Sequence, residues 1–245
     1  MPNWVYNNIA IKGKKENVLN FLNEGLKNSK LKECKTIEGA FNKLLKHAKV
    51  ATSRSMDFRR KAWGKKANVF LVNGLTLDTF RPMPNTFLQY DTTNHGSKLK
   101  SVSAYQRKKY GVVGWYDWGC VYRGTKWDAN IENFKLETDG EFATLSFYCD
   151  TAWSCPDGWL RWVKHTFKVN VFLSATEESD NFNPFYCEID GNEYDCYEGG
   201  EDMPQEDDFE CDDEFYEAFN DWREERQDVM YCEFKNYVSE YEVDC

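Results

Sequence analysis

The chain has 245 residues and a formal net charge of −10, with 41% hydrophobic and 16% aromatic residues. This length corresponds to one or two domains, and the aromatic content is high enough to build a core, which excludes wholesale disorder. No stretch approaches the roughly 20 apolar residues of a membrane-spanning helix. The first residues lack a basic segment followed by an apolar one, so we expect no secretory signal and a cytoplasmic location.

The charge is distributed unevenly. Residues 1–110 carry 22 Lys and Arg against 7 Asp and Glu, residues 111–197 carry 6 against 15, and residues 198–245 carry 3 against 19. A basic first part and an acidic last part indicate a nucleic-acid surface, a partner-binding extension, or docking of one on the other. The plainer alternative is that both parts are solvated surfaces.

The cysteines are odd in number and irregularly spaced, and no Cys-x-x-Cys pair occurs. We therefore expect reduced thiols, no metal site and no cofactor. The acidic cluster from Glu206 to Glu214 lacks the spacing of a calcium-binding loop. The nine cysteines are Cys34, Cys120, Cys149, Cys155, Cys187, Cys196, Cys211, Cys232 and Cys245.

The predicted elements begin with a strand over residues 3–12, in which apolar side chains alternate with polar ones. A helix follows over residues 15–27, with apolar residues at helical spacing and lysines opposite. A second helix is predicted over residues 37–48, with Thr36 as its N-terminal cap.

Residues 49–68 show no clear period, but basic side chains alternate there with Phe58 and Trp63. This pattern suits phosphate contact combined with base stacking, and an exposed amphipathic helix fits it equally well. The candidate nucleic-acid-binding residues are Arg54, Arg59, Arg60, Lys65 and Lys66.

The later elements complete the order β-α-β-β-α-β, which predicts an α+β fold of the ferredoxin-like sandwich type. Asp139-Gly140 is a strong hairpin signal between two of these strands. The predicted elements are strands at 130–136 and 143–149, a helix at 156–165, a strand at 168–175 and a further hairpin strand at 185–189.

We expect the ferredoxin-like domain to cover residues 1–197, with a large basic helical insertion at about 31–129 between the first helix and the second strand. Residues 198–245 would then form an acidic, aromatic-rich extension. A disordered tail would hold few aromatic residues, so we expect an ordered element there, with a helix over 212–229.

Tryptophans and charged side chains are interspersed between residues 115 and 153. Aromatic walls with a few polar groups are typical of a ligand pocket. The alternative is that the tryptophans belong to the core while the acids cap helices or fix loops. The candidate pocket residues are Trp115, Asp117, Trp118, Lys126, Trp127, Asp128, Asp150 and Trp153.

Recognisable catalytic motifs are missing from the sequence. No phosphate-binding loop, dinucleotide fingerprint or His-Glu-x-x-His motif occurs, and nothing in the pattern brings His165 near a cysteine. We therefore expect a non-enzymatic protein without catalytic residues.

Five short motifs follow one another along the chain: Met-Pro-Asn-Trp at the start, then residues 80–84, 115–118, 124–129 and 150–154. In this combination the chain resembles the phage and plasmid family with a YubB-type, Api92-like ferredoxin-like domain, over about residues 1–30 and 78–197. It departs from that family in its basic segment 31–77 and in its acidic extension. The resemblance implies an accessory protein of a mobile element and assigns no catalytic residues.

Two function classes follow. The first is a non-enzymatic interaction protein of a phage or mobile element that inhibits a host defence system. It would bind a protein target with a basic, often nucleic-acid-binding, surface. The second is a nucleotide- or nucleic-acid-binding protein that uses the basic segment or the tryptophan pocket. The sequence lacks, however, the aromatic signature of ferredoxin-like domains that bind RNA on their sheet. The candidate partner-binding residues in the extension are Asp212, Asp213, Phe215, Phe219 and Trp222.

Overall fold

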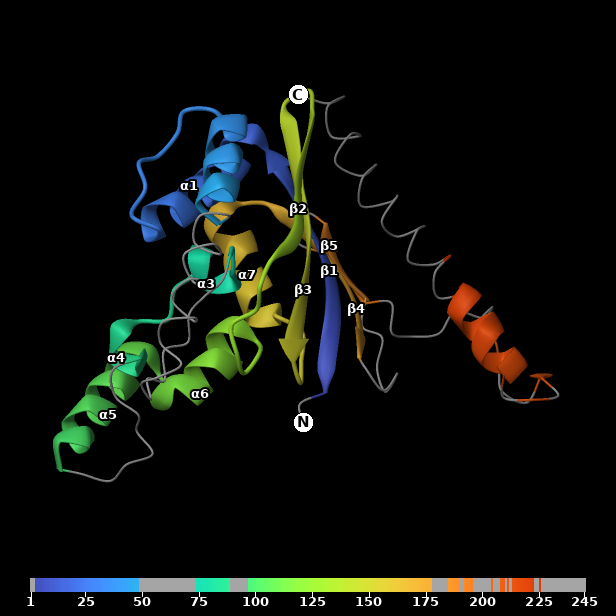
Figure 1. Cartoon of the computed structure of the whole chain (residues 1–245). Coiled ribbons are helices and arrows are strands. Elements are labelled where there is room, and N and C mark those ends of the chain that lie inside the picture. The colour runs from blue at the N-terminus through green and yellow to red at the C-terminus, as the bar shows by residue number, and fades with distance from the viewer. Residues whose placement is uncertain are drawn as a thin grey trace, which may run out of the picture.

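In the computed structural model, an antiparallel sheet of six strands carries helices on one face, so the fold is of the mixed α+β class (Figure 1). The segment 49–68, with the candidates Arg54, Arg59, Arg60, Lys65 and Lys66, lies outside the described residues. The structure describes residues 3–48, 74–88, 97–177, 185–189, 192–195, 204, 208–209, 211, 213–222 and 225.

The strands lie side by side in the order β2-β3-β1-β4-β5-β6, and every neighbouring pair is antiparallel. The central strand β1 pairs with β3 on one side and with β4 on the other. The strands are β1 (Trp4–Lys14), β2 (Glu132–Asp139), β3 (Phe142–Ala152), β4 (Asn170–Glu177), β5 (Phe185–Ile189) and β6 (Asn192–Asp195).

The hairpin that Asp139-Gly140 predicts joins β2 to β3, and Gly140 takes a left-handed φ of 49° that favours glycine. Both strands run further than the apolar pattern indicated, β2 to Asp139 and β3 to Ala152. Strand β5 pairs with β4 as predicted. Strand β6 was not predicted, because its four residues, Asn-Glu-Tyr-Asp, show no apolar alternation.

Two long helices, α1 and α7, cover the same face of the sheet (Figure 1). A further helix occupies residues 37–48, and Thr36 caps it as predicted, since the Gly39 N–H donates to Thr36 Oγ1 at 3.2 Å. Helices α3 to α6 and the π-helix η1 lie in the sequence between α1 and β2. The helices are α1 (Lys15–Asn28), α3 (Leu77–Phe80), α4 (Asn85–Leu88), α5 (Ser97–Tyr110), α6 (Gly114–Trp118), the π-helix η1 (Gly119–Arg123) and α7 (Asp157–Phe167).

The core lies between the sheet and these helices. Side chains alternate along β1, so that Val5, Ile9 and Ile11 are buried against the helices while Trp4 and Tyr6 face the other way and stay exposed. The amphipathic spacing of α1 and α7 supplies the opposing apolar side chains.

Helix α3 joins this core through an aromatic contact. The Phe80 ring is fully buried and stacks on Phe21 of α1 with ring centroids 4.3 Å apart. Trp159 of α7 lies edge-on to Phe80 at 6.2 Å, and its indole N–H donates to the Leu77 carbonyl at 3.1 Å. The segment between α1 and β2 is therefore packed into the same core as the sheet.

We predict that Phe80→Ala lowers the free energy of unfolding by about 3–5 kcal/mol, because it leaves a cavity between the buried rings of Phe21 and Trp159. Leu88→Ala, at a side chain that is 64% exposed on α4, is the matched control and should change it by less than about 0.5 kcal/mol. Urea denaturation measures both. Similar small losses in the two variants would contradict a shared core.

Candidate functional site

Exposed aromatic rings gather where β1 begins and β3 ends. Together with Lys126 they form what we call the tryptophan surface. Large aromatic side chains are usually covered, so a group of exposed ones is informative. The exposed fractions are 37% for Trp4, 38% for Tyr6, 51% for Tyr116, 38% for Trp127 and 53% for Trp153.

Lys126 sits at the centre of several of these rings. Its Nζ lies 4.8 Å from the Trp127 ring centroid and 5.8 Å from that of Tyr116, and the Trp4 and Trp127 centroids are 6.3 Å apart. An ammonium over two ring faces is attracted by their electron density. One cation and three rings are therefore brought together from β1, α6 and the loop that follows η1.

Trp153 has an unusual backbone, with a φ of 74°. The left-handed region is sparsely populated by bulky residues and is strained. The conformation is fixed because the Trp153 N–H donates to the Asn3 carbonyl at 3.0 Å and Thr151 Oγ1 donates to the Ser154 carbonyl at 2.8 Å. Neither burial of the ring nor backbone preference accounts for a tryptophan at this position.

The loop that carries Lys126 and Trp127 is held against the end of β3. Buried Thr125 donates through Oγ1 to the Ala152 carbonyl at 2.9 Å and accepts the Ala152 N–H at 3.2 Å. Ser154 Oγ donates to the Gly124 carbonyl. The loop that carries Lys126 and Trp127 is therefore anchored to the backbone just before Trp153.

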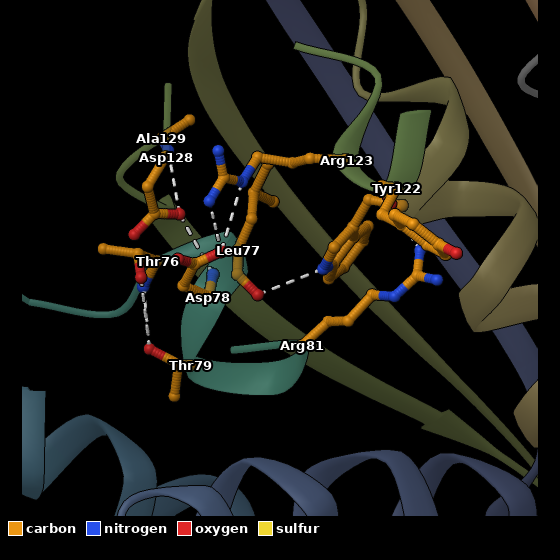
Figure 2. Close-up of polar contacts among 10 residues, drawn as sticks. Thr76, Leu77, Asp78, Thr79, Arg81, Tyr122, Arg123, Asp128 and Ala129 are labelled. Atoms are coloured by element: carbon orange, nitrogen blue, oxygen red, sulfur yellow. Dashed lines mark hydrogen bonds and ion pairs between the residues drawn. The ribbon is translucent and has the colours of Figure 1, made fainter. Parts of the chain in front are cut away.

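A buried ionic cluster anchors the other side of this loop (Figure 2). The Arg123 side chain is only 3% exposed, and its Nη2 and Nε donate to Asp78 Oδ1 at 2.7 and 3.1 Å. Asp128 Oδ1 accepts the backbone N–H groups of Asp78 and Ala129, both at 3.0 Å. Asp128 thereby ties the loop to the first turn of α3.

Two carboxyl groups and one guanidinium make this cluster sensitive to protonation. Burial raises the pKa of Asp128 to about 6, helped by the neighbouring Asp78 carboxylate and opposed by Arg123. Burial also raises the pKa of Asp78, and Arg123 again acts in the opposite direction. Asp128 is thus an anchor of the loop rather than a group presented to solvent.

The structure places the predicted pocket residues in different surroundings. Lys126, Trp127 and Trp153 belong to the tryptophan surface, and exposed Asp150 lies opposite Tyr6 in the β1–β3 register. Asp128 is turned toward the ionic cluster.

Trp118 is buried in a separate apolar cluster with Met83 and Phe87, and Trp115 packs against it. Asp117 is exposed and contributes to an open cavity of about 320 Å³, at the small end of ligand-sized cavities. The other residues that line it are Arg107, Gly111, Val112, Val113, Cys120 and Val121.

Three residues of the tryptophan surface, Trp4, Tyr6 and Tyr116, were not among the predicted site residues. A signal for two of them was present: Trp4 and Tyr6 alternate with the core residue Val5 at the start of β1, which places them on the opposite face of the sheet. No local sequence pattern predicts Tyr116 as a site residue, because its contact with Lys126 depends on the fold.

The described cysteines Cys34, Cys120, Cys149, Cys155 and Cys211 form no disulfide. Burial raises the pKa of the Cys149 thiol, and raises that of Cys155 to about 12, so both thiols stay protonated and are poor nucleophiles.

Over the described ranges, no group of three His, Cys, Asp or Glu side chains is placed to hold a metal ion. No helix among those residues has the length and apolar character needed to cross a membrane.

The described part of the acidic extension contains a helix over residues 213–222, which stands apart from the sheet in Figure 1. Phe215, Phe219 and Trp222 form a row, with successive ring centroids 5.8 and 5.7 Å apart, and Phe209 packs on Phe215 at 5.8 Å. Asp213 is exposed, and the candidate Asp212 lies outside the described residues.

Comparison with known proteins gives one distant structural likeness. No family model and no curated protein matches the chain. Among solved structures, the crystal structure of protein api92 from Yersinia pseudotuberculosis, with the family model DUF1281, is similar. It has 10% sequence identity and a TM-score of 0.33, with 80% of this chain and 97% of that chain covered. A likeness at this level carries no argument about function.

We predict that Asp128→Asn changes the pH dependence of stability. Because the folded state binds this proton more tightly than the unfolded chain, Asp128 makes the wild type less stable as pH rises from about 4 to about 6, with no further loss above. Asparagine keeps the accepting oxygen and removes the titration. The variant's unfolding free energy relative to the wild type should therefore rise across that window in denaturation series, with exposed Asp139→Asn as the charge control. A difference in unfolding free energy between the variant and the wild type that does not change with pH would contradict a raised pKa of Asp128.

We predict that Gly124→Ala destabilises the protein more than Gly111→Ala. Both glycines have a left-handed φ, 91° and 75°, which penalises alanine by about 1–2 kcal/mol. Only at Gly124 would a new Cβ clash, lying 2.1 Å from Asp157 Oδ1 and 2.8 Å from the Cys155 carbonyl, whereas Gly111 has open space. Thermal unfolding of the two variants measures the difference, and equal shifts would show that the loop does not lie against α7.

Proposed function

We propose that this chain is a non-enzymatic interaction protein of a phage or mobile element, built on a ferredoxin-like domain of the Api92-like family. It binds a host protein that has a basic surface and thereby inhibits a defence system. The observation that carries this proposal is the row of aromatic rings on an acidic helix that stands apart from the sheet (Figure 1).

The spacing of these rings supports a helix-in-groove contact. Phe215, Phe219 and Trp222 occupy positions i, i+4 and i+7, which are the anchor positions of an amphipathic helix laid into an apolar groove. Aromatic rings are frequent energetic centres of protein interfaces, because they remove a large apolar area from water.

The charges around the row support the choice of a basic partner. Acidic side chains of the same helix are exposed, and the whole segment 198–245 carries 19 Asp and Glu against 3 Lys and Arg. Complementary charge speeds association and disfavours acidic partners, while the buried rings slow dissociation of the complex. The exposed acids of the described helix are Asp213, Glu214, Glu217 and Asp221.

We predict that the triple variant Phe215→Ala, Phe219→Ala, Trp222→Ala loses its host partner while the sheet domain keeps its melting temperature. The control is Tyr216→Ala on the same helix, a ring that is 57% exposed and contacts Phe215 at 5.4 Å but does not occupy one of the three anchor positions. Quantitative affinity capture from host cells measures the loss, and capture by the wild type should weaken as salt rises. Full capture and full biological activity of the triple variant would contradict the proposal.

A further inference from the structure

We propose that the tryptophan surface and the basic helix α5 together bind single-stranded nucleic acid. Bases would stack on the exposed rings, and phosphates would follow α5. This site lies outside the acidic helix, so the inference stands or falls independently of the proposed protein partner.

Two rings of the tryptophan surface are accessible to a base. Stacking of bases on aromatic side chains is tolerant of sequence, because every base has a flat π-face. Trp127 and Trp153 are 38% and 53% exposed. Their loops are held by hydrogen bonds from Thr125 Oγ1 to the Ala152 carbonyl and from the Trp153 N–H to the Asn3 carbonyl. Rings that are fixed before binding lose little conformational freedom when a base stacks on them.

The backbone strain at Trp153 also favours a ligand at this position. A left-handed φ is unfavourable for tryptophan, and a ring that is more than half exposed recovers little of that cost by burial. Strain that the surroundings impose at an exposed side chain is typical of positions that contact a ligand. A stacked base would cover the ring.

The charge of helix α5 selects nucleic acid over other flat ligands. Its sequence, Ser97–Tyr110, holds five Lys and Arg and no acidic residue, and Arg107, Lys108 and Lys109 are exposed. Lys109 Nζ lies 5.6 and 5.2 Å from the ring centroids of Tyr105 and Tyr110, so cations and rings alternate here as well. Such a helix matches the regular negative charge of a phosphate backbone.

The buried side chain of Gln106 connects the basic helix to the aromatic rings. Its Nε2 donates to the Thr86 carbonyl at 2.8 Å, and its Oε1 accepts the Gly114 N–H at 3.2 Å. This fixes α5 to the start of α6, the helix that presents Tyr116 to Lys126. In Figure 1, α5 and α6 lie toward the end of the sheet where β1 begins.

The exposed Asp150 favours an unpaired strand. It lies opposite Tyr6 in the β1–β3 register, and Tyr148 forms a hydrogen bond with it. A carboxylate there repels a phosphate but accepts hydrogen bonds from the N–H groups of a base edge, such as N3–H of thymine, which duplex pairing would occupy. Base faces in a duplex are stacked on each other and unavailable to Trp127 and Trp153.

The test uses the full chain and a fluorescein-labelled oligothymidylate of about 15 nucleotides, with fluorescence anisotropy as the binding readout and tryptophan quenching as the second. Trp127→Ala and Trp153→Asn should each raise the Kd about 5- to 150-fold, the range expected when one stacking ring is removed. Asparagine is chosen at Trp153 because it tolerates a left-handed φ. Tyr216→Ala is the control with an exposed ring elsewhere and should leave the Kd unchanged.

A second pair of variants tests the role of α5. Lys108→Ala with Lys109→Ala should weaken binding and flatten its dependence on salt, because fewer counterions are released. Lys27→Ala, an exposed lysine on α1, should change neither. Absence of wild-type binding would overturn the proposal. So would an equal affinity for a duplex of the same length, or Trp127→Ala and Trp153→Asn variants that are folded and bind as tightly as the wild type.

Discussion

The stacking of Phe80 on Phe21 is the contact on which the arrangement of this molecule depends. It joins a short helix from the segment between α1 and β2 to the first helix of the sheet domain, and Trp159 of α7 closes it from the side. Because Phe80 belongs to a helix of only four residues, packing rather than helix propensity holds that helix in place. The same helix supplies Asp78, the acceptor for the buried guanidinium of Arg123.

The buried guanidinium of Arg123 is paired with an acid, Asp78, and this ion pair helps to position the tryptophan surface. Arg123 ends the π-helix, and Asp128 stands just beyond Lys126 and Trp127. With Arg123 held by Asp78 and Asp128 held by the α3 backbone, the intervening loop is fixed at both ends. Its cation and ring therefore face outward next to Trp4. Trp127 is exposed while the flanking side chains Arg123 and Thr125 are buried.

The sequence predicted those elements that a single local signal specifies, either a periodic pattern or a turn dipeptide. Alternation predicted β1, helical spacing predicted α1, and Asp139-Gly140 predicted the hairpin. The four-residue helices α3 and α4 were not predicted, since they are too short to show a period. The domain limits at residues 31, 129 and 197 and the partner residues of the extension stay predictions.

The candidate site was likewise predicted only in part from local sequence. Local composition pointed to Trp127, Lys126 and Trp153, but it could not separate them from Trp118, which is buried against Met83 and Phe87. Nor could it join them to Trp4, because that neighbourhood is set by the pairing of Trp4 with Ala152 across β1 and β3. Register and long-range hydrogen bonds decide which tryptophans are exposed, and neither can be read from spacing along the chain.

We propose that the end of the sheet is a recognition surface for unpaired bases. Photocrosslinking of a 4-thiothymidine oligonucleotide to the full chain, followed by mass-spectrometric mapping, tests it most directly. We expect crosslinks at Trp4, Tyr116, Trp127 or Trp153, whose side chains are 37–53% exposed. Crosslinks confined to the segment with Arg54 to Lys66, or to other residues away from this surface, would contradict it.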